Sequence, residues 1–503
     1  MPHPSLILLA PDDDVAVARI ALEPGTALDA ALVTRAPIPA GHKVALRDIA
    51  AGQPVRKYGQ VIGVATASIS AGEHVHVHNV GMADSAAQHQ VGHAYRATVP
   101  VEAPATFEGY VRSDGRVGTR NFIGVIASVN CSATVCRHIA QAAQAEAAAF
   151  PNVDGVVAIT HGSGCGMSGD GEGLTLLQRT LRGYADHPNF AGVLVVGLGC
   201  EVNQVAPLMQ MLGARAPGLF ASLTIQEEGG TREAIAAGLA TLRDMLPIAN
   251  QARRCTVPAS HLTVGLQCGG SDGYSGISAN PALGAAVDLL VRHGGTAVLS
   301  ETPEIYGAEH LLTARAATPA VADALMARLS WWERYTRTLG ADMNNNPSPG
   351  NKAGGVTTIL EKSLGAVAKG GSTGLMAVYE YAQPVNAHGL VFMDTPGYDP
   401  VSATGQVAGG ANLICFTTGR GSTYGCKPVP SLKLATNSTL FRHMELDMDY
   451  DCGGIVDGRL GIADAGEALF RLILATASGA PSKSELNGLG DNEFVPWQLG
   501  AVM

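Results

Sequence analysis

Residues 107–250 alternate short apolar runs with amphipathic stretches, and this alternation limits the chain to few folds. Each amphipathic stretch that follows an apolar run has helical periodicity. Strands that alternate with helices build a parallel sheet with crossover helices. We therefore predict an α/β domain over residues 107–250. Its apolar runs have the length of strands: FIGVIASV (122–129), GVVAIT (155–160), GVLVVGL (192–198) and SLTIQ (222–226).

The same pattern returns in the last part of the chain, residues 251–503. LTVGLQ (262–267) and TAVLS (296–300) have strand character, and residues 317–339 predict a long helix. Beyond Asn344 the sequence is rich in glycine, and its pattern does not give the order of helices and strands. We expect a second α/β domain with a mainly parallel sheet.

The N-terminal part differs from the rest. Residues 1–82 carry short β-like runs between Gly and Pro turns, and no run has helical period, which predicts a small all-β domain. Residues 83–106 have weak periodicity and two prolines, as in a linker. The predicted fold class is α/β: a small all-β domain followed by two α/β units with mainly parallel sheets.

Composition excludes several classes of protein. The 503 residues carry 33 Lys and Arg against 43 Asp and Glu, a net charge of −10, which argues against nucleic-acid or anionic-membrane partners. No apolar run approaches the ~20 residues of a membrane span. The N-terminus lacks the basic region of a signal peptide. Nine cysteines without close spacing indicate a reduced, cytoplasmic enzyme.

Cysteines follow four of the predicted strands where the strands end: Cys131, Cys165, Cys200 and Cys268. The carboxyl ends of parallel strands meet at one edge of a sheet, where α/β proteins bind ligands. Thiolates prefer iron or zinc to magnesium or calcium. We predict that some of the four hold a single Fe(II) ion or an iron–sulfur cluster. The alternative is that they are small buried residues.

Two groups suited to proton transfer also follow strand ends. His161 comes directly after GVVAIT, and Glu301 comes directly after TAVLS. Either side chain could act as a general base. The sequence does not choose between them.

EHVHVHN (73–79) places three histidines at alternate positions. In an extended strand His74, His76 and His78 would project to one face. Imidazoles bind divalent metals, so we predict that His76 and His78 serve as metal ligands. The alternative is a solvated histidine ladder on an edge strand.

Four basic residues lie in polar, Gly-rich surroundings: Arg116, Arg120, Lys352 and Arg420. Guanidinium groups pair bidentately with carboxylates, and glycines beside Arg116 and Arg420 let backbone approach a ligand closely. We predict that these residues bind the carboxylate of an anionic substrate such as a sugar acid. The alternative is that they are surface charges.

Several longer motifs resemble the altronate/galactarate dehydratase family, and the resemblance covers nearly the whole chain. The N-terminal unit resembles the SAF (β-clip) domain of that family, with His42-Lys43 and VHVHN (75–79) in the expected places. The motifs add Asn121, Ser271 and Asp272 to the expected substrate ligands. They are YVRSDGRVGTRN (110–121), HGSGC (161–165), GLGCE (197–201), CGGSD (268–272), SGISANP (275–281), NPSPGNK (346–352) and TTGRG (417–421).

The resemblance implies a cytoplasmic hydro-lyase that uses Fe2+ or Mn2+ to dehydrate a C6 sugar acid to a 2-keto-3-deoxy acid. The histidine run points to D-altronate as substrate, and the chain is expected to form a homodimer. Galactarate dehydratase and a sulfolactate-type lyase are the alternatives within the family.

Two other classes of function stay open. One is a non-catalytic sugar-acid-binding protein. The other is an NAD-dependent oxidoreductase, for which GSGCGMSG (162–169) is a poor dinucleotide fingerprint because it follows the second strand rather than the first.

Overall fold

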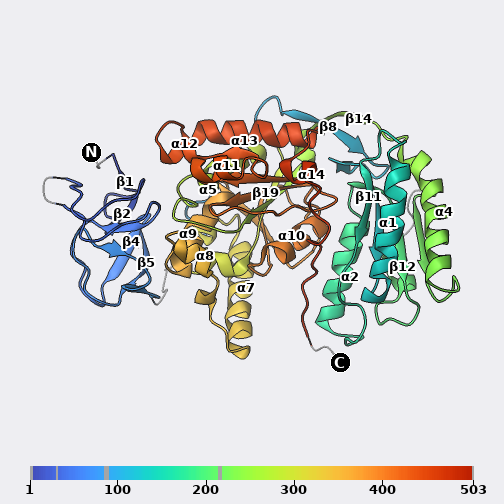
Figure 1. Ribbon diagram of the computed structural model, residues 1–503, viewed down its shortest axis with the longest axis horizontal. Helices are drawn as coiled ribbons and strands as arrows, with labels where there is room; N and C mark the ends of the chain where they lie inside the picture. Colours follow the sequence, from blue (N-terminus) through green and yellow to red (C-terminus); the bar gives the residue numbers. More distant parts are fainter. Residues whose placement is uncertain (1–3, 30–31, 84–89, 213–217, 501–503) are drawn as a thin grey trace.

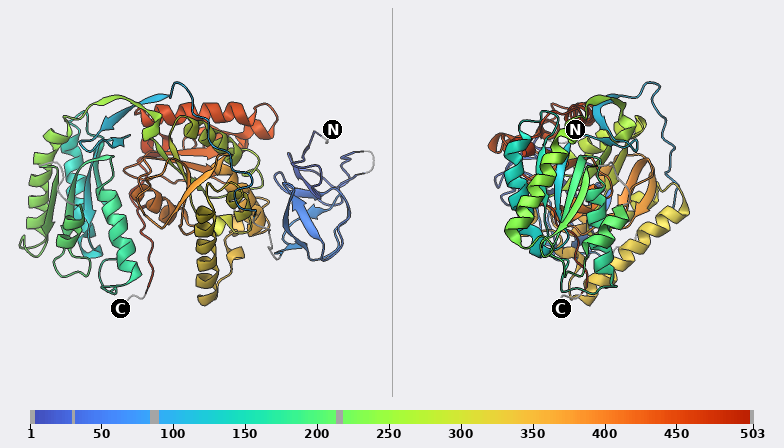
Figure 2. Two further views of the ribbon diagram at one scale, coloured as in Figure 1. Left: turned by 180° about the vertical axis from the view of Figure 1, so that it is seen from behind. Right: turned by 90° about the vertical axis from the view of Figure 1, so that its right-hand side faces the viewer.

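The structure is a computed structural model that describes residues 4–29, 32–83, 90–212 and 218–500. Three units lie in a row (Figures 1 and 2), with the N-terminal domain at one end and the second domain at the other. The C-terminal domain lies between them, so it contacts both. Among the described residues, no helix is long and apolar enough to cross a membrane.

The N-terminal domain consists of two small antiparallel sheets. The first has the order β1-β2-β3-β6 and the second the order β4-β5-β7. Short strands between tight turns follow from the frequent Gly and Pro noted above. The strands are Leu6–Ile7, Val15–Ala18, Lys43–Ala45 and His74–Val75 (β1, β2, β3, β6), and Pro54–Lys57, Gln60–Ala65 and Val80–Gly81 (β4, β5, β7).

The second domain has a parallel four-stranded sheet of order β11-β10-β12-β13. Apolar side chains of α1 and α4 cover one face of this sheet, and those of α2 and α3 cover the other. Both faces are buried, which explains why the strands read as continuous apolar runs. The elements are Phe122–Ala127, Gly155–Ile159, Phe190–Gly197 and Phe220–Thr224 (β10–β13), and Ala133–Ala147, Glu172–Ala185, Val205–Leu212 and Thr231–Ala249 (α1–α4).

The C-terminal domain has a parallel seven-stranded sheet of order β17-β18-β16-β15-β19-β20-β21. Helices α5 and α13 pack together on one face. Helix α10 packs on α2 and so joins this domain to the second one. The strands are Thr263–Cys268, Thr296–Leu299, Leu375–Tyr379, Gly389–Met393, Leu413–Thr418, Ser431–Ala435 and Tyr450–Asp451 (β15–β21).

The helices of this domain include the long one that the sequence predicts, α7. The segment beyond Asn344, whose order could not be read, supplies five of the seven strands. The helices are Ala279–Arg292, Glu309–Thr313, Pro319–Thr338, Pro349–Ala353 and Ile359–Val367 (α5–α9), and Asp399–Ala408, Ser438–His443, Gly453–Val456, Ile462–Ala477 and Lys483–Leu486 (α10–α14).

The chain enters and leaves the second domain through one small antiparallel sheet. Strand β8 (Thr106–Val111) pairs with both β9 (Val117–Gly118) and β14 (Arg254–Pro258). The two crossings between domains therefore lie side by side. The predicted fold class, an all-β domain followed by two parallel α/β units, is confirmed.

The segment between the first two domains lies outside the described residues over 84–89. The part from residue 90 onward runs along the C-terminal domain. Backbone N–H groups of Gly92 and Val101 donate to the carbonyls of Thr313 and Arg292 at 3.0 Å. This part is therefore fixed to the C-terminal domain and is not a free tether.

A buried carboxylate holds the N-terminal domain against the C-terminal domain. Glu361, in the first turn of α9, lies 2.9 Å from the Nζ atoms of both Lys43 and Lys57. Burial raises the pKa of this carboxyl, but the two lysines outweigh burial and hold the pKa well below its ordinary value. Apolar residues of both domains, among them Val55 and Leu364, also form one continuous core. The all-β domain is therefore part of the protein's interior packing.

We predict that Glu361→Gln destabilises this junction by about 3–5 kcal/mol, because two buried ammonium groups lose their counter-charge. Thermal unfolding should show a lower Tm. Glu146→Gln is the control, because it breaks only an exposed pair with Arg243 and should leave the Tm nearly unchanged. Equal Tm values for the two variants would contradict the assignment.

Candidate functional site

Three loops meet at the carboxyl edge of the seven-stranded sheet. The loop after β15 contains Gly270 and Ser271. The Gly270 carbonyl accepts hydrogen bonds from the backbone N–H groups of Gly419 and Arg420 at 3.0 and 2.9 Å. The Ser271 carbonyl accepts from Asn351 Nδ2 at 3.0 Å, which ties the loop to α8. Four of the predicted substrate ligands, Ser271, Asp272, Lys352 and Arg420, are thus brought together.

Asp272 organises these loops. Its carboxylate accepts hydrogen bonds from the hydroxyls of Ser275 and Thr436 and from Asn437 Nδ2. Burial raises the pKa of this carboxyl, and the hydrogen bonds oppose that shift. Asp272 is therefore a positioning residue for the loops, and its predicted contact with substrate is not supported by this placement.

Two cations flank the same loop without partners. In the described part of the chain, neither the Lys352 ammonium nor the Arg420 guanidinium has a hydrogen bond or an ion pair. Lys352 is half-buried and Arg420 is exposed. Both are therefore available to bind an anionic ligand.

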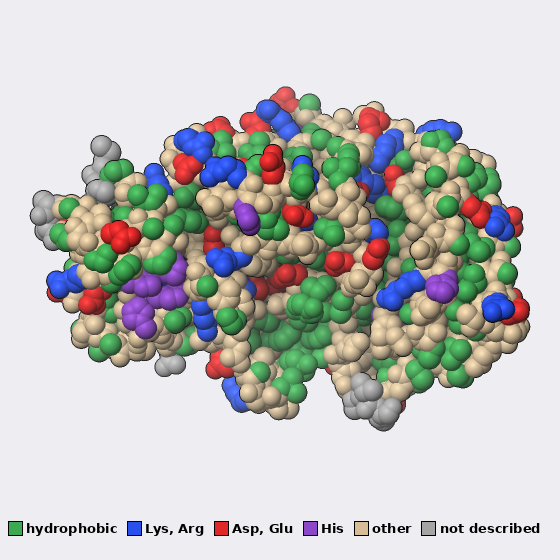
Figure 3. All heavy atoms as spheres, viewed as in Figure 1, with side chains coloured by type: hydrophobic (Ala, Val, Ile, Leu, Met, Phe, Trp, Pro, Cys, Tyr) green, Lys and Arg blue, Asp and Glu red, His purple; other side chains and the backbone are tan. Residues whose placement is uncertain are grey.

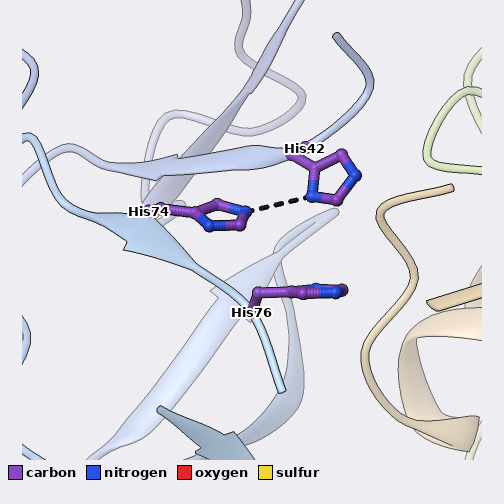
Figure 4. Close-up of side chains that lie close together, drawn as sticks. All are labelled: His42, His74 and His76. Atoms are coloured by element: carbon purple, nitrogen blue, oxygen red, sulfur yellow. Dashed lines mark hydrogen bonds between the residues drawn. The ribbon is translucent and has the colours of Figure 1, made fainter. Parts of the chain in front are cut away.

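Histidines of the N-terminal domain face this edge. His42 Nε2 lies 3.2 Å from the Ala353 carbonyl, next to Lys352. The three rings of His42, His74 and His76 point toward one another (Figure 4), with one ligand nitrogen of each within 4.8 Å of the others. The histidines form one surface patch where the N-terminal domain meets the C-terminal domain (Figure 3).

These imidazoles fit a divalent metal ion. Burial, followed by the charges of neighbouring side chains, lowers the pKa of His74 to about 3 and that of His76 to about 4. Metals bind the neutral imidazole. His76 Nδ1 is also buried without a hydrogen-bond partner among the described residues. A buried nitrogen without a hydrogen-bond partner, beside two further imidazoles, fits the ligand set of a divalent ion.

The prediction for this run was right about clustering but wrong about its geometry. Strand β6 ends at Val75, and His76 begins a turn in which its carbonyl accepts from the N–H groups of Asn79 and Val80. His78 is exposed and does not belong to the close group. His42 does, because β3 pairs with β6 in antiparallel register and brings it beside His74. Local sequence signals do not place His42 beside His74, because the two are 32 residues apart and only the pairing of β3 with β6 brings them together.

A second close group of potential ligands lies at the ends of β15 and β16: Cys268, Glu301 and Glu304. Two lysines already balance the negative charge of this group. Lys369 Nζ lies 2.8 Å from Cys268 Sγ and 3.2 Å from Glu301 Oε2, and Lys362 Nζ lies 2.8 Å from Glu304 Oε1. Bound ammonium groups occupy the positions that a cation would need. This group is therefore a buried ion-pair cluster, and the predicted metal role of Cys268 is not supported.

The two candidate bases have different surroundings. His161 Nε2 bonds to the Ala127 carbonyl at 3.0 Å, and His161 Nδ1 accepts from the Ser163 N–H at 3.2 Å. Burial lowers the pKa of this imidazole to about 4. Both nitrogens are therefore engaged by backbone, which leaves His161 no free position for a proton from substrate.

Glu301 retains a free oxygen. Its Oε1 is buried without a hydrogen-bond partner in the described structure, and its backbone is left-handed with φ 68°. Burial, followed by the charge of Glu304, raises the pKa of this carboxyl. Strain and an unpaired polar atom at a strand end are typical of functional sites.

Three of the predicted substrate ligands lie elsewhere. Arg116 forms exposed ion pairs with Asp114 and Asp186. Arg120 bonds to Glu485 at 2.6 Å and so ties the second domain to the C-terminal one. Asn121 is buried and donates to the carbonyls of Asn152 and Ala249. Carboxylates and backbone carbonyls already bind these three side chains, so they are not placed to bind substrate. The Gly-rich hairpin that carries them is a junction between domains.

The other predicted cysteine ligands lie in the second domain. Cys131, Cys165 and Cys200 follow β10, β11 and β12, and all three are exposed free thiols. Cys268 is the last residue of β15, in the other sheet, and is buried. Cys268 therefore cannot join the other three, because the two α/β units predicted from the sequence form two separate sheets.

Comparison with known proteins covers all three domains. Residues 4–83 match the altronate/galactarate dehydratase SAF domain, and residues 109–250 match the second domain of D-galactarate dehydratase/altronate hydrolase. Residues 259–502 match the C-terminal domain of D-galactarate/altronate dehydratase.

Whole-chain relatives agree with these matches. Altronate dehydratase of Escherichia coli is 36% identical, over 94% of this chain and 95% of its own. Galactarate dehydratase (L-threo-forming) of Escherichia coli is 38% identical, over 88% and 86%. Altronate dehydratase of Bacillus subtilis is 34% identical, over 89% and 90%. The resemblance read from the motifs is confirmed, and the chain belongs to the D-galactarate/altronate dehydratase family.

Proposed function

We propose that this protein is a hydro-lyase that dehydrates D-altronate to a 2-keto-3-deoxy acid. One observation carries the proposal: two unpaired cations and three imidazoles converge at the carboxyl edge of the seven-stranded sheet. A sugar acid offers a carboxylate for the cations and hydroxyl oxygens for a metal ion. D-altronate is preferred to galactarate because the altronate dehydratase of Escherichia coli matches over more of the chain, 94% against 88%.

Lys352 and Arg420 hold the substrate carboxylate. The reaction removes the proton from C2 and expels the C3 hydroxyl as water, and the resulting enol tautomerises to the 2-keto acid. Negative charge grows on the carboxylate while the C2–H bond breaks. Two fixed cations stabilise that charge more in the transition state than in the ground state, which accelerates the step.

His42, His74 and His76 would hold the divalent ion, Fe2+ or Mn2+. When bound, such an ion polarises a substrate oxygen as a Lewis acid. The neutral imidazoles and the orphaned His76 nitrogen support this assignment over one on Cys268 or on His78.

Glu301 takes the C2 proton. Its free Oε1 and its place at the end of β16, next to β15, support it over His161. The side chain is fully buried, so substrate reaches it only after a conformational change. Glu301→Gln should lower kcat by about 100-fold or more, whereas His161→Asn should keep most of it; the reverse order of effects would reject Glu301.

The proposal is tested by a substrate panel. Purified protein supplied with Fe2+ under anaerobic conditions is given D-altronate, galactarate and (2R)-sulfolactate, and 2-keto acid release is measured. We expect the highest kcat/KM with D-altronate and no requirement for NAD. Binding without turnover would indicate a sugar-acid-binding protein, sulfite release a sulfolactate-type lyase, and NADH formation an oxidoreductase. The homodimer and the cytoplasmic location stay predictions.

The carboxylate assignment predicts that Arg420→Ala and Lys352→Ala each lower kcat/KM for D-altronate by about tenfold or more, the effect of losing about 1.5–3 kcal/mol of charged hydrogen bonding. Arg116→Ala is the matched control, since this exposed arginine is paired with Asp114 and Asp186. It should retain nearly wild-type kinetics. If Arg116→Ala lost activity and the other two did not, the site would lie elsewhere.

The metal assignment predicts that His74→Ala weakens Mn2+ binding by about tenfold or more, measured by equilibrium titration of the metal without substrate. The control is His138→Ala, which removes an exposed histidine of α1. Equal Mn2+ affinity in the two variants would remove the three histidines as the site.

A further inference from the structure

Three cysteine-bearing loops are bonded together at the carboxyl edge of the four-stranded sheet. The Asn130 N–H, next to Cys131, donates to the Ser163 carbonyl at 2.9 Å. The Asn203 N–H donates to the Gly164 carbonyl, next to Cys165, at 3.0 Å. Asn203 Nδ2 also donates to the Ser128 carbonyl at 2.8 Å. The loops after β10, β11 and β12 therefore form one rigid surface.

Each loop presents one free thiol on that surface. Strand β10 lies between β11 and β12, so Cys131 comes from the middle strand and Cys165 and Cys200 from its two neighbours. Neighbouring strands are about 4.8 Å apart, so the three thiols start from adjacent positions. Gln226 Nε2 lies 3.5 Å from Cys200 Sγ and can donate a hydrogen bond to a thiolate there.

The loop backbones adopt shapes that only glycine accepts readily. Gly164 and Gly166, on either side of Cys165, have φ of 98° and 64°, and Gly199, before Cys200, has φ of 128°. A Cβ on Gly164 would lie 2.6 Å from the Ser128 carbonyl oxygen. Gly164 therefore lets the loops after β10 and β11 pack directly against each other.

The three thiols are not grouped as three ligands of one metal ion would be. Two thiolates on one metal ion lie within about 4.6 Å of each other, since each bond is about 2.3 Å. Among the described residues, Cys131, Cys165 and Cys200 do not form a group whose ligand atoms are all within 4.8 Å. In an iron–sulfur cluster each thiolate binds a different iron, so the sulfurs stand farther apart.

A pocket of about 340 Å³ adjoins the surface. Asn130 and His161 line it together with Thr134 and Arg137 of α1. Cys131 lies just before α1, whose N-terminus favours an anionic sulfur. The pocket therefore offers room for a small oxygen ligand next to the loops that carry Cys131 and Cys165.

We propose that Cys131, Cys165 and Cys200 bind a [4Fe–4S] cluster, with the fourth iron open to a small oxygen ligand such as water or a hydroxy acid in the adjoining pocket. This site lies in the second domain, whereas the proposed substrate site lies at the junction of the N-terminal and C-terminal domains. The inference does not rest on the proposed function, because its residues and its ligand are different.

The test uses full-length protein purified without oxygen. We expect about four iron and four acid-labile sulfide per chain, with broad visible absorption that dithionite bleaches. Single Cys131→Ser, Cys165→Ser and Cys200→Ser variants should lose the sulfide and the absorption while their Tm stays close to that of wild type. Cys255→Ser, an exposed cysteine in β14, is the matched control and should keep both.

Other outcomes overturn the proposal. Protein without acid-labile sulfide after anaerobic purification and after reconstitution with iron and sulfide would exclude a cluster, and one zinc or iron per chain without sulfide would indicate a single-ion site. A cluster that persists in all three serine variants would belong to other residues. His74→Ala should retain the cluster, so a failure of the proposed substrate site is distinguishable from a failure here.

Discussion

The arrangement of the proposed substrate site depends on one buried carboxylate. Glu361 binds Lys43 and Lys57 from the N-terminal domain and also accepts from the Thr357 hydroxyl at 2.6 Å. Lys43 follows His42 directly, so the contact that joins the domains also fixes a histidine against α8. Charges this deeply buried are costly unless each is matched, which makes the junction specific for one docking geometry.

The two α/β domains place their reactive side chains in the same way. Each has a parallel sheet, and each gathers its reactive side chains at the carboxyl edge of that sheet. In the C-terminal domain these side chains are carboxylates and lysines. The N-terminal domain covers them and adds imidazoles. In the second domain they are thiols, which stay exposed. Three exposed thiols thus lie at the sheet of the second domain, whereas the one thiol at the edge of the C-terminal sheet, Cys268, is buried among ion pairs.

Much of the fold could be predicted from sequence because strand-length apolar runs and helical periods are local signals. The strands after Asn344 could not, since Gly-rich loops break the periods and β19 pairs with β15 about 150 residues away, as in Ile414 beside Gly265. The same limit applies to the site residues: local signals reveal some of them, but not those that pairing between distant strands brings in. Cys131 and Glu301 were predicted from their place after a strand. His42 was named only as part of a family motif, and not as a metal ligand, because strand pairing is what brings it beside His74. Arg120 and Asn121 looked like ligands because a polar, Gly-rich hairpin that joins domains has the composition of a binding loop.

The shared core of the first and third domains also has a consequence for how the chain folds during synthesis. Lys57 leaves the ribosome 304 residues before Glu361. At about 5–20 residues per second, the apolar face of the N-terminal domain therefore waits roughly 15–60 s for α9 to cover it. During that interval Val55 and its neighbours lack the part of their core that the C-terminal domain supplies in the finished protein. The N-terminal domain is thus made first, but its packing is completed late. During the interval its exposed apolar surface is open to chaperones that bind such surfaces.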